Sequence, residues 1–381
     1  MPPSTTPPAK TPSIKDVARL AQVSVGTVSN VLNGRGFVRN EVRQRVEAAI
    51  DSLGYVPNPT AQALRRGVSP LVGVAVYDLT NPFFMEAASG MERRLAADGC
   101  VMALSSTKSS PTTEATLLRA LMGQAVRGIL LTPSDPELSA AREVVQRGIP
   151  VVLFDSPAQP EDMSSISVDD RTGASLAIQH LMSLGHTNIM FFNGPASIRQ
   201  AQDRLHGAED ALGAALAMQA HRSSGDEPAP QLHTLNLPAF TAEAGRTTMR
   251  ALLEKEGIPT PVAQDNASLP GRPTTPPALP DSFPTAFFCA NDLIAFGAMT
   301  MLRDAGIRVP DDVSIVGFDD IAIAAQMSVP LTTVRQPMEE LGWAAADLLL
   351  GDKTGKPRIQ HLKFFPTLVT RASTAAPRHT S

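Results

Sequence analysis

Five residues of one short segment carry small or hydrogen-bonding side chains and no acidic group, and they are Val25, Gly26, Thr27, Ser29 and Asn30. Hydroxyl and amide groups can exchange hydrogen bonds with phosphate oxygens and base edges, so a helix that presents them outward could lie in the major groove of DNA. Any small helical unit can carry such a run, however, and this segment alone leaves both interpretations open.

The residues around this run predict a helix-turn-helix. Ser13 with Asp16 three positions later is typical of a capping box, and the apolar stripe that begins at Ile14 predicts a first short helix. Ser24 opens the second helix after a connection of about three residues. A third amphipathic helix is expected from about Asn40 to Leu53.

The distribution of charge favours a nucleic-acid partner for this segment. Residues 13–66 contain eight basic and four acidic side chains, a net charge of +4, so the rest of a chain with a net charge of −4 carries −8. A small basic head on an acidic body is expected of a DNA-anchored module with a separate regulatory domain.

The segment Asn58–Gly67 has the features of a complete miniature helix, with an Asn cap, a Pro in the first turn and a Gly stop. Because it is too short to be stable alone in water, a second copy of the chain and DNA would have to order it. Leu64, beside Arg65 and Arg66, could be an apolar wedge for a minor groove. A plain linker helix that docks on the body is the alternative.

From Leu71 onward, short apolar runs alternate with amphipathic helices. This alternation predicts an α/β fold of parallel sheets covered by helices, in two lobes, with a ligand cleft beyond the carboxyl ends of the strands. The expected strands are 71–76, 101–104, 128–131, 151–154, 189–192, 232–235, 286–289 and 314–317. The expected helices lie near 83–97, 111–124, 136–147, 173–184, 201–218, 242–256 and 293–304.

Polar residues cluster at the ends of these predicted strands, and they are Tyr77, Asp78, Thr132, Asp155, Asn193, Asn291 and Asp292. Several carboxylates with few lysines nearby suit hydroxyl-rich or amine-bearing ligands. Any one of these side chains could instead cap a helix or a turn.

Other classes of protein find little support in the sequence. Apolar residues make up 43% and charged residues 18%, which is ordinary globular composition. No apolar run reaches the roughly 18–20 residues of a membrane span, and the N-terminal MPPSTTPPAKTPS lacks the apolar core of a secretory signal, so a cytoplasmic protein without membrane contact is expected.

Cys100 and Cys289 lack metal-ligand spacing. With no phosphate loop, G-x-S-x-G elbow, H-E-x-x-H or dinucleotide glycine signature, we expect no enzyme, no metal and no cofactor.

The run IKDVARLAQVSVGTVSNVLNGRGFV…RVEAAIDSLGYVPNPTAQALR closely resembles the head and hinge of the lactose-repressor (LacI/GalR) family of bacterial transcriptional regulators. The resemblance implies that Val25 and Gly26 read operator bases and that Leu64 wedges the central minor groove. Asn30 stands where many members carry Arg, which favours adenine over guanine contacts. The positions expected to contact double-stranded operator DNA are Ser24, Val25, Gly26, Thr27, Ser29, Asn30, Asn33, Tyr55, Asn58, Ala61 and Leu64.

Stretches such as GVAVYDLTNPFF, ANDLIAFGAM and VPDDVSIVGFDD resemble the effector domain of the same family, which shares its fold with periplasmic sugar-binding proteins. The resemblance implies that Arg204 binds the ligand through its guanidinium, that Phe240 stacks on it and that Asp292 accepts paired hydroxyl donors. The full set of implied effector contacts is Tyr77, Phe83, Thr132, Asp155, Arg204, Phe240 and Asp292.

The predicted organisation is a disordered tail (1–12), a helix-turn-helix domain (13–57), a hinge helix (58–68), an effector-binding and dimerisation domain (69–371) and a second disordered tail (372–381). Lobe one is expected to span about 69–168 plus 334–355, and lobe two about 169–333 plus 356–371. The Pro-rich segment 259–284 is expected to be a flexible inserted loop.

The predicted function is a sequence-specific repressor that binds a pseudo-palindromic operator as a homodimer, with a sugar or related polyol as effector in the cleft. A homodimer is favoured because the C-terminal residues lack the leucine repeat of a coiled coil. The alternatives are a purine-like co-repressor or an activator in the same architecture, and an α/β enzyme is the least favoured.

Overall fold

The computed structural model describes residues 12–33, 37–55, 69–221, 228–260, 277–351 and 359–378. The chain divides into two compact units, Met1–Pro70 and Leu71–Ser381, each with its own hydrophobic core. Within the described residues, no helix has the length and apolar character to cross a membrane.

In its described residues, the first unit contains three helices, α1 (Ile14–Leu20), α2 (Val25–Asn33) and α3 (Asn40–Leu53), as the sequence predicts. The capping box of α1 is present, because the Ser13 backbone N–H donates to the Asp16 carboxylate over 3.0 Å. Ser24 caps α2 by accepting a 3.0 Å hydrogen bond from the Thr27 backbone N–H. One small core joins the helices and consists of Val17, Ala18, Ala21, Val28, Val31, Val46 and Ala49.

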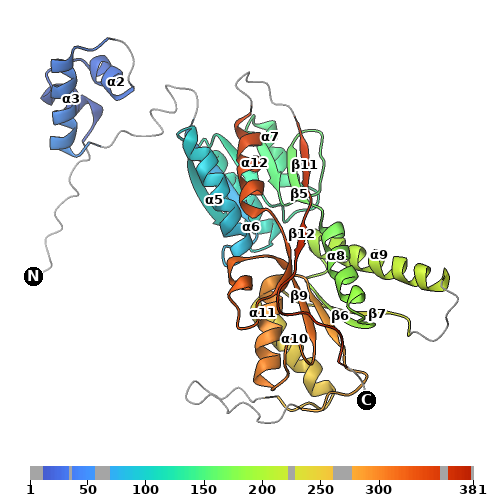
Figure 1. Cartoon of the computed structure of the whole chain (residues 1–381). Helices are drawn as coiled ribbons and strands as arrows, with labels where there is room; N and C mark the ends of the chain where they lie inside the picture. Colours follow the sequence, from blue (N-terminus) through green and yellow to red (C-terminus); the bar gives the residue numbers. More distant parts are fainter. Residues whose placement is uncertain are drawn as a thin grey trace, which may run out of the picture. The chain divides into compact units, whose positions relative to one another are not determined.

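The second unit contains two six-stranded sheets, one in each lobe (Figure 1). The first sheet is parallel throughout and has the order β11 (His361–Phe364), β5 (Ser164–Val168), β4 (Val151–Phe154), β3 (Gly128–Leu131), β1 (Leu71–Val76) and β2 (Val101–Ser106). The second sheet has the order β12 (Thr367–Val369), β10 (Thr332–Arg335), β9 (Ser314–Asp319), β8 (Ala286–Cys289), β6 (Asn188–Asn193) and β7 (Gln231–Asn236). In this second sheet β12 alone is antiparallel to its neighbour.

Helices cover both faces of the first sheet. Alternating residues of β1 point to opposite faces, so Val72, Val74 and Val76 share one core with α5 (Pro82–Ala97) and α12 (Met338–Leu350). Ala75 belongs to a separate core with α6 (Pro111–Gly123) and α7 (Ser139–Gln146).

The helices of the second lobe pack in pairs against the second sheet. Helix α8 (Asp170–Ser183) packs on α9 (Arg199–His221), and α10 (Ala242–Lys255) packs on α11 (Asp292–Asp304). A short 3₁₀ helix, η1 (Ala322–Ala325), follows β9. Its preceding residue, Ile321, is buried in the core of the first lobe.

The chain crosses between the lobes three times: between β5 and α8, between β10 and α12, and between β11 and β12. As a result α12 and β11, drawn in red in Figure 1, complete a first lobe whose other elements come from residues 71–168. The three crossings are the covalent connections between the two lobes.

All eight strands expected in the body are present, each within two residues of its predicted bounds. Helix α7 begins at Ser139 and not near Pro136, because the Asp135 carboxylate accepts the backbone N–H groups of Glu137 and Ser139 and holds the segment in a turn.

The predicted division of the lobes is wrong near the C-terminus. Residues 356–371 were expected in lobe two, but β11 pairs in parallel with β5, from His361 opposite Ser165 to Phe364 opposite Val168. Only Phe365 and Pro366 separate β11 from β12, and the pattern of this short run does not reveal that the two strands join different sheets. Strand β10 also stays in the second sheet, whereas lobe one was expected to resume at 334.

Two segments that were expected to be irregular are ordered in part. In the predicted tail, Ser373 is fully buried, and its carbonyl accepts a 2.8 Å hydrogen bond from the Ile315 backbone N–H. In the predicted insertion, Phe283 is fully buried in the core of the second lobe. Residues 372–378 and 277–284 are therefore structured, and 261–276 lie outside the described residues.

Helices α5 and α12 approach so closely that a glycine is required where they touch. A Cβ atom built on Gly342 would lie 1.8 Å from the carbonyl oxygen of Ala87, a distance that no side chain can occupy. We therefore expect Gly342→Ala to lower the free energy of unfolding by about 1–3 kcal/mol or more, measured by urea denaturation.

Gly213, in the middle of α9, provides the matched control because nothing lies within 4 Å of the position that a Cβ atom would take there. Gly213→Ala should raise the free energy of unfolding by about 0.5–1 kcal/mol, since alanine loses less backbone entropy in a helix. Equal effects of the two substitutions would show that helix propensity, and not the α5–α12 contact, determines the result.

Candidate functional site

A cavity of about 980 Å³ lies where the carboxyl ends of the strands of both lobes meet. Tyr77 follows β1, Asp155 follows β4, Asn291 follows β8 and Asp319 ends β9, and all four line the cavity. This is the location expected for a ligand site in open α/β sheets.

An aromatic cluster forms the first-lobe side of the cavity. The Asn81 side chain accepts a 3.0 Å hydrogen bond from the Phe83 backbone N–H, and with Pro82 at the first helical position it fixes the start of α5. The rings of Phe83 and Phe84 meet edge to face with centroids 5.0 Å apart. Tyr77 completes the cluster, and its hydroxyl donates to the Pro133 carbonyl over 2.7 Å.

Phe240 lies on the second-lobe side, in the loop after β7. Its ring occupies the space beside Gly194, where a Cβ atom would come within 2.2 Å of the ring. The ring position therefore depends on a glycine directly after β6. The Arg204 guanidinium lies 5.9 Å from the Phe240 ring centroid and only 3.8 Å from that of Phe318.

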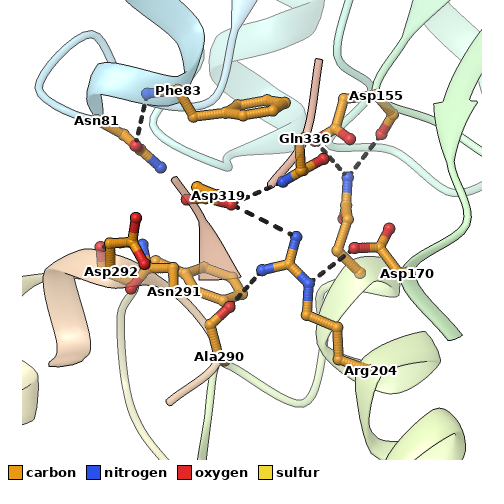
Figure 2. Close-up of polar contacts among 12 residues, drawn as sticks. Asn81, Phe83, Asp155, Asp170, Arg204, Ala290, Asn291, Asp292, Asp319 and Gln336 are labelled. Atoms are coloured by element: carbon orange, nitrogen blue, oxygen red, sulfur yellow. Dashed lines mark hydrogen bonds and ion pairs between the residues drawn. The ribbon is translucent and has the colours of Figure 1, made fainter. Parts of the chain in front are cut away.

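Arg204, on α9, is almost completely buried and is bound on several sides (Figure 2). Its Nε donates to Asp170 over 2.7 Å, one terminal nitrogen donates to the Ala290 carbonyl, and the other lies 3.9 Å from the Asp319 carboxylate. Breaking such a buried pair leaves an uncompensated charge, so this cation and its acids depend on one another.

Burial controls the protonation of the acids in the wall. It raises the pKa of Asp155 well above its usual range; the charge of Asp170 raises it further, and that of Arg204 lowers it. Burial also raises the pKa of Asp319 to about 7, although Arg204 lowers it. The structure places more buried carboxyl groups here than one guanidinium can balance.

Direct hydrogen bonds connect the lobes beside the cavity. The Gln200 amide, on α9, donates to both the carbonyl oxygen and the carboxylate of Asp155, over 2.6 and 2.9 Å. Asp155 adopts a left-handed backbone conformation with φ of 52°. On another part of the interface, the Ala322 backbone N–H donates to Glu86 over 3.3 Å.

Five of the seven predicted effector residues line the cavity, namely Tyr77, Phe83, Asp155, Arg204 and Phe240. Asp292 and Thr132 are fully buried away from its wall. The Asp292 carboxylate accepts hydrogen bonds from the Thr333 hydroxyl at 2.6 Å and the Ile321 backbone N–H at 2.9 Å, so it connects α11 to β10 and η1. The expectation that Asp292 presents its carboxylate to the ligand is therefore not met in this structure.

Several residues of the wall are not among those expected from the sequence. Asp319 and Gln336 line the cavity, and their strand-end positions after β9 and β10 could have revealed them. Gln200, which also lines the cavity, and Asp170, which binds Arg204 without lining the cavity, lie within helices, where no strand-end rule applies. Only the fold shows that these two side chains reach Arg204 and Asp155.

The head presents its predicted recognition residues on α2. Ser24, Val25, Gly26 and Asn30 are exposed, whereas Thr27 and Ser29 are half-buried. Tyr55 is also half-buried and packs against the helical core. Asn58, Ala61 and Leu64 lie outside the described residues, as does the side chain of Asn33.

Comparison with known proteins identifies both units. Residues 13–58 match the bacterial regulatory proteins of the lacI family. Residues 69–235 match the periplasmic binding proteins and sugar-binding domain of the LacI family, and 178–374 match a periplasmic binding protein-like domain. The ribose operon repressor of Escherichia coli is 33% identical over 372 residues, which cover 95% of this chain and 99% of that protein. The chain belongs to the LacI family.

Solved structures of the family have the same architecture. The Lac repressor dimer bound to operator and the anti-inducer ONPF is similar with a TM-score of 0.76 and 28% identity over 96% of this chain and 100% of that one. A LacI-family regulator from Enterococcus faecium with bound ribose has a TM-score of 0.64 and 28% identity, and the match covers 80% of this chain and 99% of that one. This LacI-family protein is thus a helix-turn-helix transcriptional regulator and not an enzyme. The residues that the structure describes contain no cluster of acidic, His or Cys side chains suited to a metal ion.

We expect Asp319 to make the stability of this regulator depend on pH. Because its folded-state pKa of about 7 exceeds the usual 3.8, the folded chain binds an extra proton between these values and loses stability as the pH rises through them. Asp319→Asn should make the slope of unfolding free energy against pH less negative between pH 4 and 7, by about 1 kcal/mol or more across the range.

The measurement is urea denaturation at several pH values without ligand. His186, whose pKa burial lowers to about 4, has the opposite sign, because it charges more readily when unfolded and so adds stability as the pH rises. His186 is present in both the wild type and the Asp319→Asn variant, so its contribution cancels when their unfolding free energies are subtracted. Parallel curves for wild type and variant would contradict the role assigned to Asp319.

Proposed function

We propose that this LacI-family regulator is a cytoplasmic repressor that binds a pseudo-palindromic operator as a homodimer and is controlled by a carbohydrate-like effector. The observation that carries the proposal is the cavity of about 980 Å³ between two lobes that share a chain with a helix-turn-helix head. A cavity of this size encloses a small molecule of one or two rings.

The chemistry of the cavity supports a sugar or polyol. Phe83 and Phe240 offer aromatic faces from opposite lobes, and such faces suit the apolar side of a sugar ring. Asp155, Asp319 and Asn291 supply polar groups for hydroxyls. The ribose in the similar Enterococcus faecium structure is consistent with this ligand class.

The interlobe contacts suggest how the effector acts. Gln200 bonds to Asp155 across the lobes, and both residues line the cavity, so a ligand that engages either one changes the relative stability of lobe arrangements. The two recognition helices of a dimer would enter adjacent major grooves, and the hinge segments would bend the operator centre. An effector that binds one arrangement more tightly then shifts operator affinity by at most the difference between its binding free energies for the two arrangements.

A thermal-shift screen against sugars, polyols and nucleobases tests the proposal. A ligand selective for the folded state raises the melting temperature, and the positive compounds are then added to a gel-shift titration with an operator selected from random double-stranded DNA. We expect a sugar or polyol to stabilise the chain and to release the operator. A response to nucleobases alone would favour the purine-like alternative, and tighter operator binding with a sugar would contradict induction.

Phe240→Ala should weaken effector binding at least about tenfold, because truncation removes a stacking surface worth about 1.4 kcal/mol or more. Isothermal titration calorimetry with the effector measures this loss, and operator affinity without effector should be unchanged. Phe365→Ala is the control, since this ring is 69% exposed and lies outside the cavity wall. If both variants bind effector as the wild type does, Phe240 is not part of the site.

Leu64→Ala should weaken binding to the selected operator at least about tenfold, because an apolar wedge favours the bent DNA that the head requires. Binding to nonspecific DNA and the effector-induced rise in melting temperature should stay unchanged. Gel-shift titrations with both kinds of DNA provide the measurement. Equal operator affinity of variant and wild type would exclude the wedge.

A further inference from the structure

The segment that follows β9 carries a second-lobe residue into the first lobe. Ile321 stands between β9 and β10, both strands of the second sheet, yet its side chain is 1% exposed and packs in the first-lobe core. Among the described residues, every other buried member of that core belongs to an element of the first lobe. Ile321 therefore crosses the boundary between the lobes.

The chain reaches this position through an unfavourable backbone conformation. Asp319 and Asp320 have φ values of 112° and 62°, in the left-handed region that residues with a Cβ atom seldom adopt. Two such residues in succession persist only where the surrounding structure holds them. The contacts of this segment must therefore outweigh the cost of its turn.

Polar contacts hold the segment to the second lobe. The Asp292 carboxylate accepts a hydrogen bond from the Ile321 backbone N–H over 2.9 Å. Asp320 forms ion pairs with Arg335 and Arg371, each at 2.6 Å. Because the Asp320 carboxylate is nearly buried, breaking these ion pairs is costly. Asp292, which does not line the cavity, thus positions the segment that carries Ile321.

The contacts of the segment with the first lobe are of a weaker kind. One is the apolar burial of Ile321, and the other is the hydrogen bond that Glu86 on α5 accepts from the Ala322 backbone N–H over 3.3 Å, a long distance for such a bond. Apolar contacts have no fixed direction, and withdrawing Ile321 from the core breaks none of the ion pairs of the segment. If the lobes separate, the segment therefore stays with the second lobe.

We infer that Ile321 is a latch between the lobes, which sits in the first-lobe core in the arrangement described here and leaves that core when the lobes move apart. Asp319, where the segment begins, lines the ligand cavity, so a bound molecule can contact it. Because burying an isoleucine side chain is favourable, the latch should shift the equilibrium between lobe arrangements by at least about tenfold. The inference goes beyond the proposed function and rests on the lobe movement which that function includes.

Distances between spin labels on the full chain, measured by pulsed electron paramagnetic resonance, test the latch without effector or operator. Gln146→Cys on α7 and Ala251→Cys on α10 place one label at an exposed position of each lobe, and the native Cys100 and Cys289 are buried. Each labelled protein is mixed with an excess of the same protein without the introduced cysteines, so that an assembly carries one label pair. Ile321→Ala should populate a second distance at least about tenfold more than the wild type does.

Leu349→Ala is the matched control, because it removes the same number of carbon atoms from the same core at a position that belongs to the first lobe. This variant should have a lower melting temperature and the distances of the wild type. Ile321→Val leaves a smaller cavity and is the variant to use should Ile321→Ala fail to fold. It should shift the populations in the same direction by a smaller factor.

Wild-type distances in the variants of Ile321 would overturn the inference and would make this residue a pivot that stays in the first-lobe core however the lobes move. An equal change in the Leu349→Ala variant would also overturn it, because a loosened core would then explain the result. Both outcomes leave the proposed function intact, since the measurement involves neither effector nor operator.

Discussion

The buried guanidinium of Arg204 connects the parts from which the ligand cavity is built. It binds Asp170 at the first interlobe crossing, the Ala290 carbonyl at the end of β8 and, at longer range, Asp319 at the end of β9. Its flat face also packs on Phe318. A cation held on so many sides cannot move without disturbing the start of α8 and two strand ends, so it fixes the second-lobe side of the cavity.

Much of the fold could be predicted because its determinants are local. Strands such as β1 and β8 are uninterrupted apolar runs, and buried parallel strands have this pattern. The head could be predicted because Ser13 and Ser24 cap their helices in the way that their spacing indicates. Tyr77 and Asp155 were found because residues after parallel strands gather at one edge of a sheet.

The remainder depends on tertiary contacts that a pattern does not contain. A strand-end position does not determine which way a side chain turns. Asp292 was expected in the cavity on the basis of its position, but hydrogen bonds from Thr333 and Ile321 hold its carboxylate away from the cavity. Strand β11 is short and only half-buried, so nothing in its residues assigned it to the first sheet. Gln200 contributes through a contact with Asp155, 45 positions earlier in the chain, which only the folded arrangement creates.

The three crossings also determine the order in which the chain can fold during synthesis. The first lobe begins at β1, yet it requires α12 and β11, which lie more than 260 residues further along the chain. The second lobe takes most of its elements from residues 170–335, and it also requires β12 and the buried Ser373 near the end of the chain. On the ribosome, the lobe encoded first therefore stays incomplete until almost the whole chain has been made, and until then the apolar faces of α5 and β5 stay open to chaperones and to aggregation.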